Sequence, residues 1–450
     1  MRYGSLLARI AVVGLTGCGS GELPSSPDLA RGGGSGRSAG PLVTATQPNA
    51  APRATTLDVR VIGSGYDAGS RAVWALNRDT LFTTTRIRTN STTFVSSTEL
   101  VANITIEADA AIDLHDVVVI TAGGKKGIGL ELFAVTLEAV DLGAGEFSEA
   151  TAINDAGQVA GNSQAGAFLW DAGSLTYLGT LPGRSFSQAR DINNTGDIVG
   201  SSCNVDGGCI AFRWRAGSLT ELSPPVGYCC SEAHAVNDQG DVVGSVSVAA
   251  TESHAAVWLA GATVATDIQA PRDGWSYAWD INAQRTVVGT YDQTPDIAGG
   301  QGSYAWTASS GLQFLGGQGD QGEALGINDA GQIVGWASPT GAPSDLIAYI
   351  WQNGARQYLG TLGGRSSVGM DINEDGVVTG RSDTGIRRSG ALQHVAFLWN
   401  SEGGMHALEL GSGFDYAMGV DINASGWVVG MAWRARGINF ATLWRPRPAP

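Results

Sequence analysis

The chain has 450 residues, of which 43% are hydrophobic, and this is enough for two or three globular domains. Its net charge of −15 is spread along the sequence without a basic block, which argues against nucleic acid and anionic membrane surfaces as partners. The 65 glycines recur at fixed places, so they indicate turns in a repeated structure and not disorder.

Residues 1–18, MRYGSLLARIAVVGLTGC, have the features of an export signal. Arg2 and Arg9 give a positive start, and the apolar run is too short to cross a bilayer. The last four residues, Leu-Thr-Gly-Cys, resemble the lipobox of bacterial lipoproteins, in which the cysteine, here Cys18, is acylated. The resemblance implies a lipid-anchored protein of the bacterial cell envelope, at the outer membrane or cell surface, with the anchor as its only membrane contact. An ordinary secretory peptide is the alternative.

Residues 19–54 are rich in Gly, Ser, Pro and Ala and lack apolar periodicity, which predicts a disordered linker. Residues 55–136 alternate in short β-type runs separated by polar turns, and this pattern predicts a small β-sandwich. The segments IGSGYDAGS, SSTELVANITI and DVVVITAGGKKG resemble an IPT/TIG domain of the immunoglobulin-like class. That resemblance implies a spacer or protein-contact module.

A unit of about 45 residues recurs seven times within residues 137–446. Each unit has an Asn turn, a Gly-terminated strand and then a tryptophan. The asparagines are Asn154, Asn193, Asn237, Asn282, Asn328, Asn373 and Asn423. Each unit can be written as four strands, so the chain is predicted to be all-β, with a seven-bladed β-propeller preceded by a small immunoglobulin-like sandwich. A parallel β-helix is the alternative, and residues 447–450 form a tail.

Fixed positions in the unit support stacked sheets. A small residue lies three before each tryptophan and most units carry an aromatic residue two before it, which predicts one flat and one bulky sheet face. A glycine ends the second strand, and we expect it to allow close approach of a neighbour or a positive φ. Residues 139–143 match the fourth strand that the last unit lacks, so we expect them to close the ring.

The combination of IN-turn-G-x-VVG, AFxW and LGTLGG-S-x-A resembles the HAF repeats of extracellular bacterial proteins, over all seven units. The histidine of the family's triplet remains only loosely, as His254 and His394. The resemblance implies surface display and no particular chemistry.

The Asn-x-x-Gly turns are expected to be structural, because the asparagine can cap its own turn. Residues 371–376 also fit the start of a calcium loop, but Ser382 stands where the later carboxylate should be. We therefore expect no metal and no cofactor, with calcium as the alternative.

The remaining cysteines, Cys203, Cys209, Cys229 and Cys230, fall in one region. Export favours disulfides over free thiols. Cys203 and Cys209 can staple a hairpin, with Cys229–Cys230 as a vicinal disulfide, or the pairs can link two loops. A four-cysteine zinc site is the other alternative.

The sequence favours binding over catalysis, because it contains no GxSxG or HExxH motif and its histidines lack ligand spacing. An extracytoplasmic carbohydrate-active or other hydrolytic propeller enzyme is the alternative function. In the first strand of each unit, the residues two and four before the Ile or Val vary, and we expect them to ring a channel mouth where a protein or glycan binds. Packing between blades is their alternative role. The candidates are Trp279 and Tyr277 for stacking, His234 as a titratable base, Arg190 as a cation, and Glu232, Glu149 and Glu323.

Overall fold

The structure is a computed structural model that describes residues 40–76, 86–107, 110, 114–249, 252–268, 274–292, 301–316, 321–339, 345–388, 390–401, 403–411, 413–434 and 437–446. Within these ranges the regular elements are strands and there is no helix, so the prediction of an all-β chain is confirmed. The strands form nine four-stranded sheets. Cys18 and the predicted signal of residues 1–18 lie outside the described residues, as does the tail of residues 447–450.

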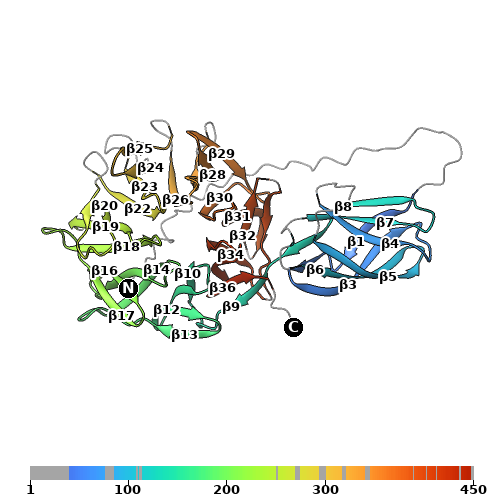
Figure 1. Cartoon of the computed structure of the whole chain (residues 1–450), viewed down its shortest axis with the longest axis horizontal. Coiled ribbons are helices and arrows are strands. Elements are labelled where there is room, and N and C mark those ends of the chain that lie inside the picture. Colours follow the sequence, from blue (N-terminus) through green and yellow to red (C-terminus); the bar gives the residue numbers. More distant parts are fainter. Residues whose placement is uncertain are drawn as a thin grey trace. The chain divides into compact units, whose positions relative to one another are not determined.

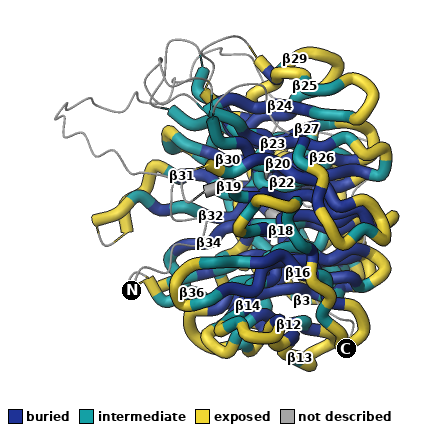
Figure 2. The backbone as a smooth tube through the Cα atoms, turned by 90° about the vertical axis from the view of Figure 1, so that its left-hand side faces the viewer, coloured by how far each residue is buried: buried dark blue, intermediate teal, exposed yellow. Residues whose placement is uncertain are grey.

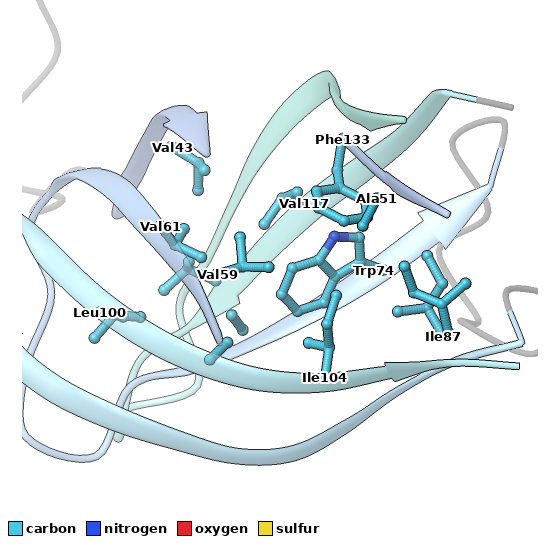
Figure 3. Close-up of a cluster of buried hydrophobic side chains, with 14 of the residues drawn as sticks. Val43, Ala51, Val59, Val61, Trp74, Ile87, Leu100, Ile104, Val117 and Phe133 are labelled. Carbon is cyan, nitrogen blue, oxygen red and sulfur yellow. The ribbon is translucent and has the colours of Figure 1, made fainter. Parts of the chain in front are cut away.

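Two sheets near the N-terminus form a β-sandwich. One has the order β1 (Leu42–Gln47), β3 (Thr55–Ser64), β6 (Glu99–Ile106), β5 (Ile87–Ser96), and the other β2 (Ala50–Pro52), β8 (Lys126–Thr136), β7 (Leu114–Ile120), β4 (Arg71–Leu76). Apolar side chains from both sheets share one core, in which Trp74 packs edge-on against Phe133 with ring centroids 5.9 Å apart (Figure 3). The alternating apolar residues of these strands point into that core because successive side chains leave a strand on opposite faces.

The predicted linker of residues 19–54 is wrong at its C-terminal end. β1 pairs with β3 in antiparallel fashion, and β2 pairs with β8 in parallel. Val43 and Ala51, which lie on these two strands, are buried in the sandwich core. Small apolar residues suffice here because the facing strands supply the bulk of the core, so composition alone was misleading.

The other seven sheets each contain four antiparallel strands. The first four are β10 (Glu149–Ile153), β11 (Val159–Ser163), β12 (Gly166–Asp171), β13 (Ser174–Tyr177); β14 (Phe186–Ile192), β15 (Ile198–Cys203), β16 (Cys209–Arg215), β17 (Ser218–Leu222); β18 (Cys230–Val236), β19 (Val242–Ala249), β20 (Glu252–Trp258), β21 (Thr266–Asp267); β22 (Ser276–Ile281), β23 (Val287–Asp292), β24 (Gln301–Thr307), β25 (Gly311–Phe314). The last three are β26 (Gly322–Ile327), β27 (Ile333–Ala337), β28 (Ile347–Gln352), β29 (Ala355–Gly360); β30 (Ser367–Ile372), β31 (Val378–Arg388), β32 (Ala391–Asn400), β33 (Gly404–Ala407); β34 (Tyr416–Ile422), β35 (Val428–Trp433), β36 (Asn439–Arg445), β9 (Glu138–Asp141).

These sheets form a ring, which is the arrangement of a β-propeller (Figure 1). Each sheet packs against the next one along the chain, and β10 of the first sheet packs against β34 and β35 of the last. The first strand of each sheet lies innermost (Figure 1). β9 pairs with β36, with Ala139 opposite Trp444, so the prediction that the segment before the repeats completes the last sheet is confirmed.

Packing between sheets follows the fixed positions of the repeat. The strands are buried, while most turns are exposed (Figure 2). The predicted aromatic residues on the third strands are fully buried. They are Phe168, Phe212, Tyr304, Tyr349 and Phe397.

The glycine that ends each second strand is required by close approach. A Cβ on Gly244 would lie 1.9 Å from the carbonyl oxygen of Glu232, and the equivalent distance in the seven sheets is 1.9 to 2.5 Å. None of these seven glycines has a positive φ, so of the two expected reasons only the steric one holds.

Candidate functional site around the ring axis

A closed ring of seven hydrogen bonds joins the turns that follow the first strands of the seven sheets. The side-chain amide of each repeat asparagine donates to the backbone carbonyl of the asparagine in the next sheet, at 2.9 to 3.2 Å, and Asn423 returns to Asn154 at 3.1 Å. The side-chain oxygen of each accepts the backbone N–H four residues later in its own turn. The turns are therefore structural, as predicted, and they also fix the contact between sheets.

The calcium-like segment takes part in the same ring. Asn373 donates to the carbonyl of Asn423 and accepts the N–H groups of Asp375 and Val377, so both of its polar atoms are engaged. Among the residues that the structure describes, no group of three or more His, Cys, Asp or Glu side chains is arranged to hold a metal ion.

A β-bulge occurs in the innermost strand of each of the seven ring sheets. The register of the first and second strands shifts just before the Ile or Val, so that one residue is extra. A bulge re-aims the side chains beside it. The extra residues are the variable ones two before the Ile or Val, namely Thr151, Arg190, His234, Trp279, Leu325, Met370 and Val420.

The structure brings three of the seven candidate ligand-binding residues into one aromatic cluster, which we define as Trp275, Tyr277, Trp279 and His234. The ring centroid of Trp279 lies 4.7 Å from that of His234 and 5.4 Å from that of Tyr277. Trp275 joins at 5.5 Å from Tyr277. The indole of Trp279 donates to Thr290 Oγ1 at 2.8 Å, which fixes it on the neighbouring strand.

His234 has a larger structural role than the sequence indicated. The residue is 7% exposed, and its Nδ1 lies 2.7 Å from the carbonyl oxygen of Ala278 in the next sheet. Because a carbonyl only accepts, Nδ1 donates there. The alternative role of packing between blades therefore applies to this residue.

A glutamate–histidine pair lies beside the aromatic cluster. The carboxylate of Glu232 is 3.9 Å from His234 Nε2, too far for a hydrogen bond. The His234 imidazole and, more weakly, the Arg190 guanidinium hold the pKa of Glu232 below its usual range. Arg190 lies on β14, Glu232 and His234 lie on β18, and the other rings lie on or just before β22, so these groups come from three successive sheets.

Glu149 and Glu323 occupy the same register position as Glu232 but bind within their own sheets. Glu149 accepts a hydrogen bond from Asn162, and Glu323 accepts one from the indole of Trp336 at 3.1 Å. Burial raises the pKa of Glu323.

Four aspartates near the axis were missed in the sequence. Each precedes the Ile of its unit, and one of its oxygens accepts the N–H of the equivalent Ile or Val in the next sheet at 2.6 to 3.1 Å. They are Asp191, Asp280, Asp371 and Asp421. The recurrence of Asp at this position in four of the seven units was the available signal, but its meaning depends on the bulge.

Three of these carboxyl groups have a raised pKa. Asp191 and Asp280 are half-buried. The loss of water around their carboxyl groups raises the pKa of Asp191 to about 6 and that of Asp280 to about 8. Burial also raises the pKa of Asp421, and repulsion by Asp371 contributes to all three shifts. Raised carboxyl pKa values are frequent at functional sites, although structural networks produce them too.

The cysteine predictions are confirmed in part. Cys203 and Cys209 form a disulfide, because they lie opposite each other on β15 and β16 with Cα atoms 4.1 Å apart. Cys229 and Cys230 are free, which corrects the expected vicinal or inter-loop disulfide. Cys230 is in register with Ser247, and the Cys229 thiol faces the Ser247 carbonyl at 3.3 Å.

No protein-family model and no curated protein matches the chain. Among solved structures it is similar to the β-propeller domain of the Trilobed protease from Pyrococcus furiosus, with 9% identity over 90% of this chain and 93% of that one and a TM-score of 0.41. A gluconolactonase from Xanthomonas campestris has 13% identity over 69% and 90%, with a TM-score of 0.35. An auxiliary nutrient binding protein from Bacteroides ovatus has 11% identity over 90% and 98%, with a TM-score of 0.32. These likenesses are too weak to carry an argument, so the fold rests on the sheet order and the ring contacts. No helix that could span a membrane occurs in the described ranges.

Proposed function

We propose that this protein is a binding protein of the bacterial cell envelope, and that its seven ring sheets are the blades of a seven-bladed propeller. Its ligand, a glycan or a protein segment, binds where Arg190, Glu232 and the aromatic cluster converge. The observation that carries this proposal is that convergence, because three separate sheets supply stacking surfaces, a cation and a carboxylate to one place. Ligand sites typically combine aromatic surface with a few polar groups that fix orientation.

The chemistry of these groups suits a ligand rich in hydroxyl or amide groups. Glu232 stays ionised, because His234 and Arg190 lower its pKa, and it can accept hydrogen bonds. Arg190 is always charged and offers several donors. The aromatic rings give apolar contact area that loses little conformational entropy on binding.

The test is a glycan array and a peptide array probed with the full chain. We expect Trp279→Ala and Arg190→Ala each to weaken binding of the ligand found by at least about tenfold. Arg88→Ala is the matched control, because Arg88 is an exposed arginine of the sandwich. Unchanged affinity in both site variants, with their folding intact by circular dichroism, places the ligand elsewhere.

A hydrolytic enzyme is the second candidate function, favoured by the four aspartates near the axis. A carboxyl group with a raised pKa can act as a general acid beside an ionised carboxylate that acts as a base. The oxygens of these aspartates already accept backbone N–H groups of neighbouring sheets, so they also have a structural use. The test is hydrolysis of a chromogenic glycoside or ester. Activity that is present in wild type and lost in Asp280→Asn, with the fold retained, supports an enzymatic function.

We also propose that Cys18 carries the lipid anchor, that residues 55–136 are an IPT/TIG-like spacer, and that the repeats are of the HAF type. The sequence motifs support these three assignments. In a Gram-negative host, Cys18→Ala is expected to move the protein from the membrane fraction to the soluble envelope fraction and to abolish incorporation of a labelled fatty acid. If the variant still requires detergent for extraction from membranes, the proposal that Cys18 carries the lipid anchor is contradicted.

A further inference from the structure

Four cysteines form one sulfur cluster at the contact between two neighbouring sheets. The Cys203–Cys209 disulfide closes the β15–β16 hairpin. Cys230 begins β18, the first strand of the next sheet, which packs against β16. The hydroxyl of Ser231, the residue after Cys230, accepts the backbone N–H of Ala211, two residues after Cys209, at 3.0 Å, so the starts of β18 and β16 lie side by side. Two thiols therefore stand beside one disulfide, and the proposed ligand site does not include any of them.

The two free thiols differ in environment. Cys229 is exposed, whereas Cys230 is partly buried. Burial raises the pKa of Cys230, and the neighbouring Cys229 thiol adds to this shift. The attacking species in thiol–disulfide exchange is the thiolate, so Cys230 is slow to react at neutral pH and becomes reactive as the pH rises.

We propose that Cys229 and Cys230 form a dithiol site that exchanges with the Cys203–Cys209 disulfide and so moves the cross-link from one hairpin to the contact between two sheets. This activity goes beyond the proposed function and does not depend on it. Its substrate is a disulfide, and the internal one is the first within reach.

The exchange balances without an external oxidant or reductant. The Cys230 thiolate attacks Cys209 Sγ, the bond between Cys203 and Cys209 breaks, and its electron pair leaves with Cys203, which takes up a proton. The new Cys209–Cys230 bond joins β16 to β18. In a second step the Cys229 thiolate attacks Cys230 Sγ and releases Cys209 as a thiol. One disulfide and two thiols are present throughout.

Burial slows the exchange at neutral pH. Cys203 is 2% exposed, so a thiolate leaving at that position is poorly solvated. Starting from the hairpin disulfide, the exchange is therefore slow at low pH, and it becomes faster as the pH rises because more of the attacking thiol is then thiolate. Because β18 also carries Glu232 and His234, the inter-sheet bond ties the strand with these residues to β16.

The test is disulfide mapping of the full chain without reductant. Samples are held at about pH 6 and about pH 8.5, acidified, alkylated with N-ethylmaleimide and digested for mass spectrometry without reduction. At the lower pH we expect only Cys203–Cys209, with both other thiols alkylated. At the higher pH we expect Cys209–Cys230 and Cys229–Cys230 linkages, forming about tenfold faster per pH unit below the pKa of Cys230. Cys203–Cys209 alone at both pH values, or a disulfide-linked dimer instead, overturns the proposal.

Two serine variants leave the hairpin disulfide intact and separate the steps. Cys230→Ser should lose both new linkages, whereas Cys229→Ser should keep Cys209–Cys230 and lose only the vicinal one. New linkages that persist in Cys230→Ser contradict the mechanism. In Cys203→Ser with oxidised glutathione, we expect Cys209 to pair with Cys230, and a stable glutathione adduct on Cys209 counts against the required proximity.

Discussion

The ring of asparagine hydrogen bonds can be tested at a single position, Asn193. Its Nδ2 donates to the Asn237 carbonyl at 2.9 Å, and its Oδ1 accepts the N–H groups of Thr195 and Asp197. The residue is 5% exposed. Asn193→Asp keeps the shape and the acceptor, but it replaces the donor by a carboxylate oxygen that faces a carbonyl oxygen. The variant therefore isolates the ring bond from the local turn.

The expected loss is about 2–4 kcal/mol in the free energy of unfolding at neutral pH, made of about 1 kcal/mol for the missing hydrogen bond and about 1–3 kcal/mol for the buried polar group left without a partner. When the carboxyl group is protonated, it can donate to the Asn237 carbonyl again. Its folded-state pKa is thus raised above the unfolded value of about 4, so its stability contribution is present at low pH and is lost as the pH rises through the folded-state pKa.

The assay is urea unfolding followed by tryptophan fluorescence at about pH 5 and about pH 8, always as the difference from wild type. Asn193→Ala removes donor and acceptor together, so its deficit should be similar in size but independent of pH. Asn353→Asp is the control at an exposed turn and should match wild type. The reasoning is refuted if Asn193→Asp is as stable as wild type at pH 8, or if its deficit does not shrink at pH 5.

Three further predictions concern the close approach at Gly244, the closing strand β9 and the pH dependence of stability. Gly244→Ala should destabilise the protein by more than about 3 kcal/mol, because the new Cβ would overlap the Glu232 carbonyl oxygen, and urea unfolding measures this loss. Deletion of residues 139–142 should leave β36 as an open edge, with a lower melting temperature and association detected by light scattering. For wild type, the free energy of unfolding should fall as the pH rises from about 4 to about 8, because carboxyl groups such as Asp280 have raised folded-state pKa values.

Each of these has its own control. Gly208→Ala, at a glycine where an added Cβ meets only Arg184 at 3.9 Å, should have little effect, and an equal loss in both glycine variants removes the steric explanation. A deletion variant that stays monomeric with an unchanged melting temperature shows that β9 does not close the ring. Asp280→Asn should flatten the pH dependence of stability, and an identical slope in this variant excludes Asp280 as a source.

The sequence by itself determined the repeated features. The spacing of the asparagines and tryptophans gave seven units of four strands, and the segment of residues 139–143 gave the closing strand, because hydrophobic and turn residues at a fixed period specify one supersecondary unit many times. The hairpin disulfide was also predictable, since a short cross-strand pair needs only local geometry.

Only the tertiary structure decided what the inner strands do. The β-bulge places Trp279 against His234 and turns the aspartates toward neighbouring sheets, and it is invisible in a pattern of side-chain types because it depends on which backbone groups pair. The asparagine ring closes between residues 269 positions apart, Asn154 and Asn423, so local turn chemistry could show each turn but not their connection. The strands at 42–52 were missed because partners distant in sequence supply their core.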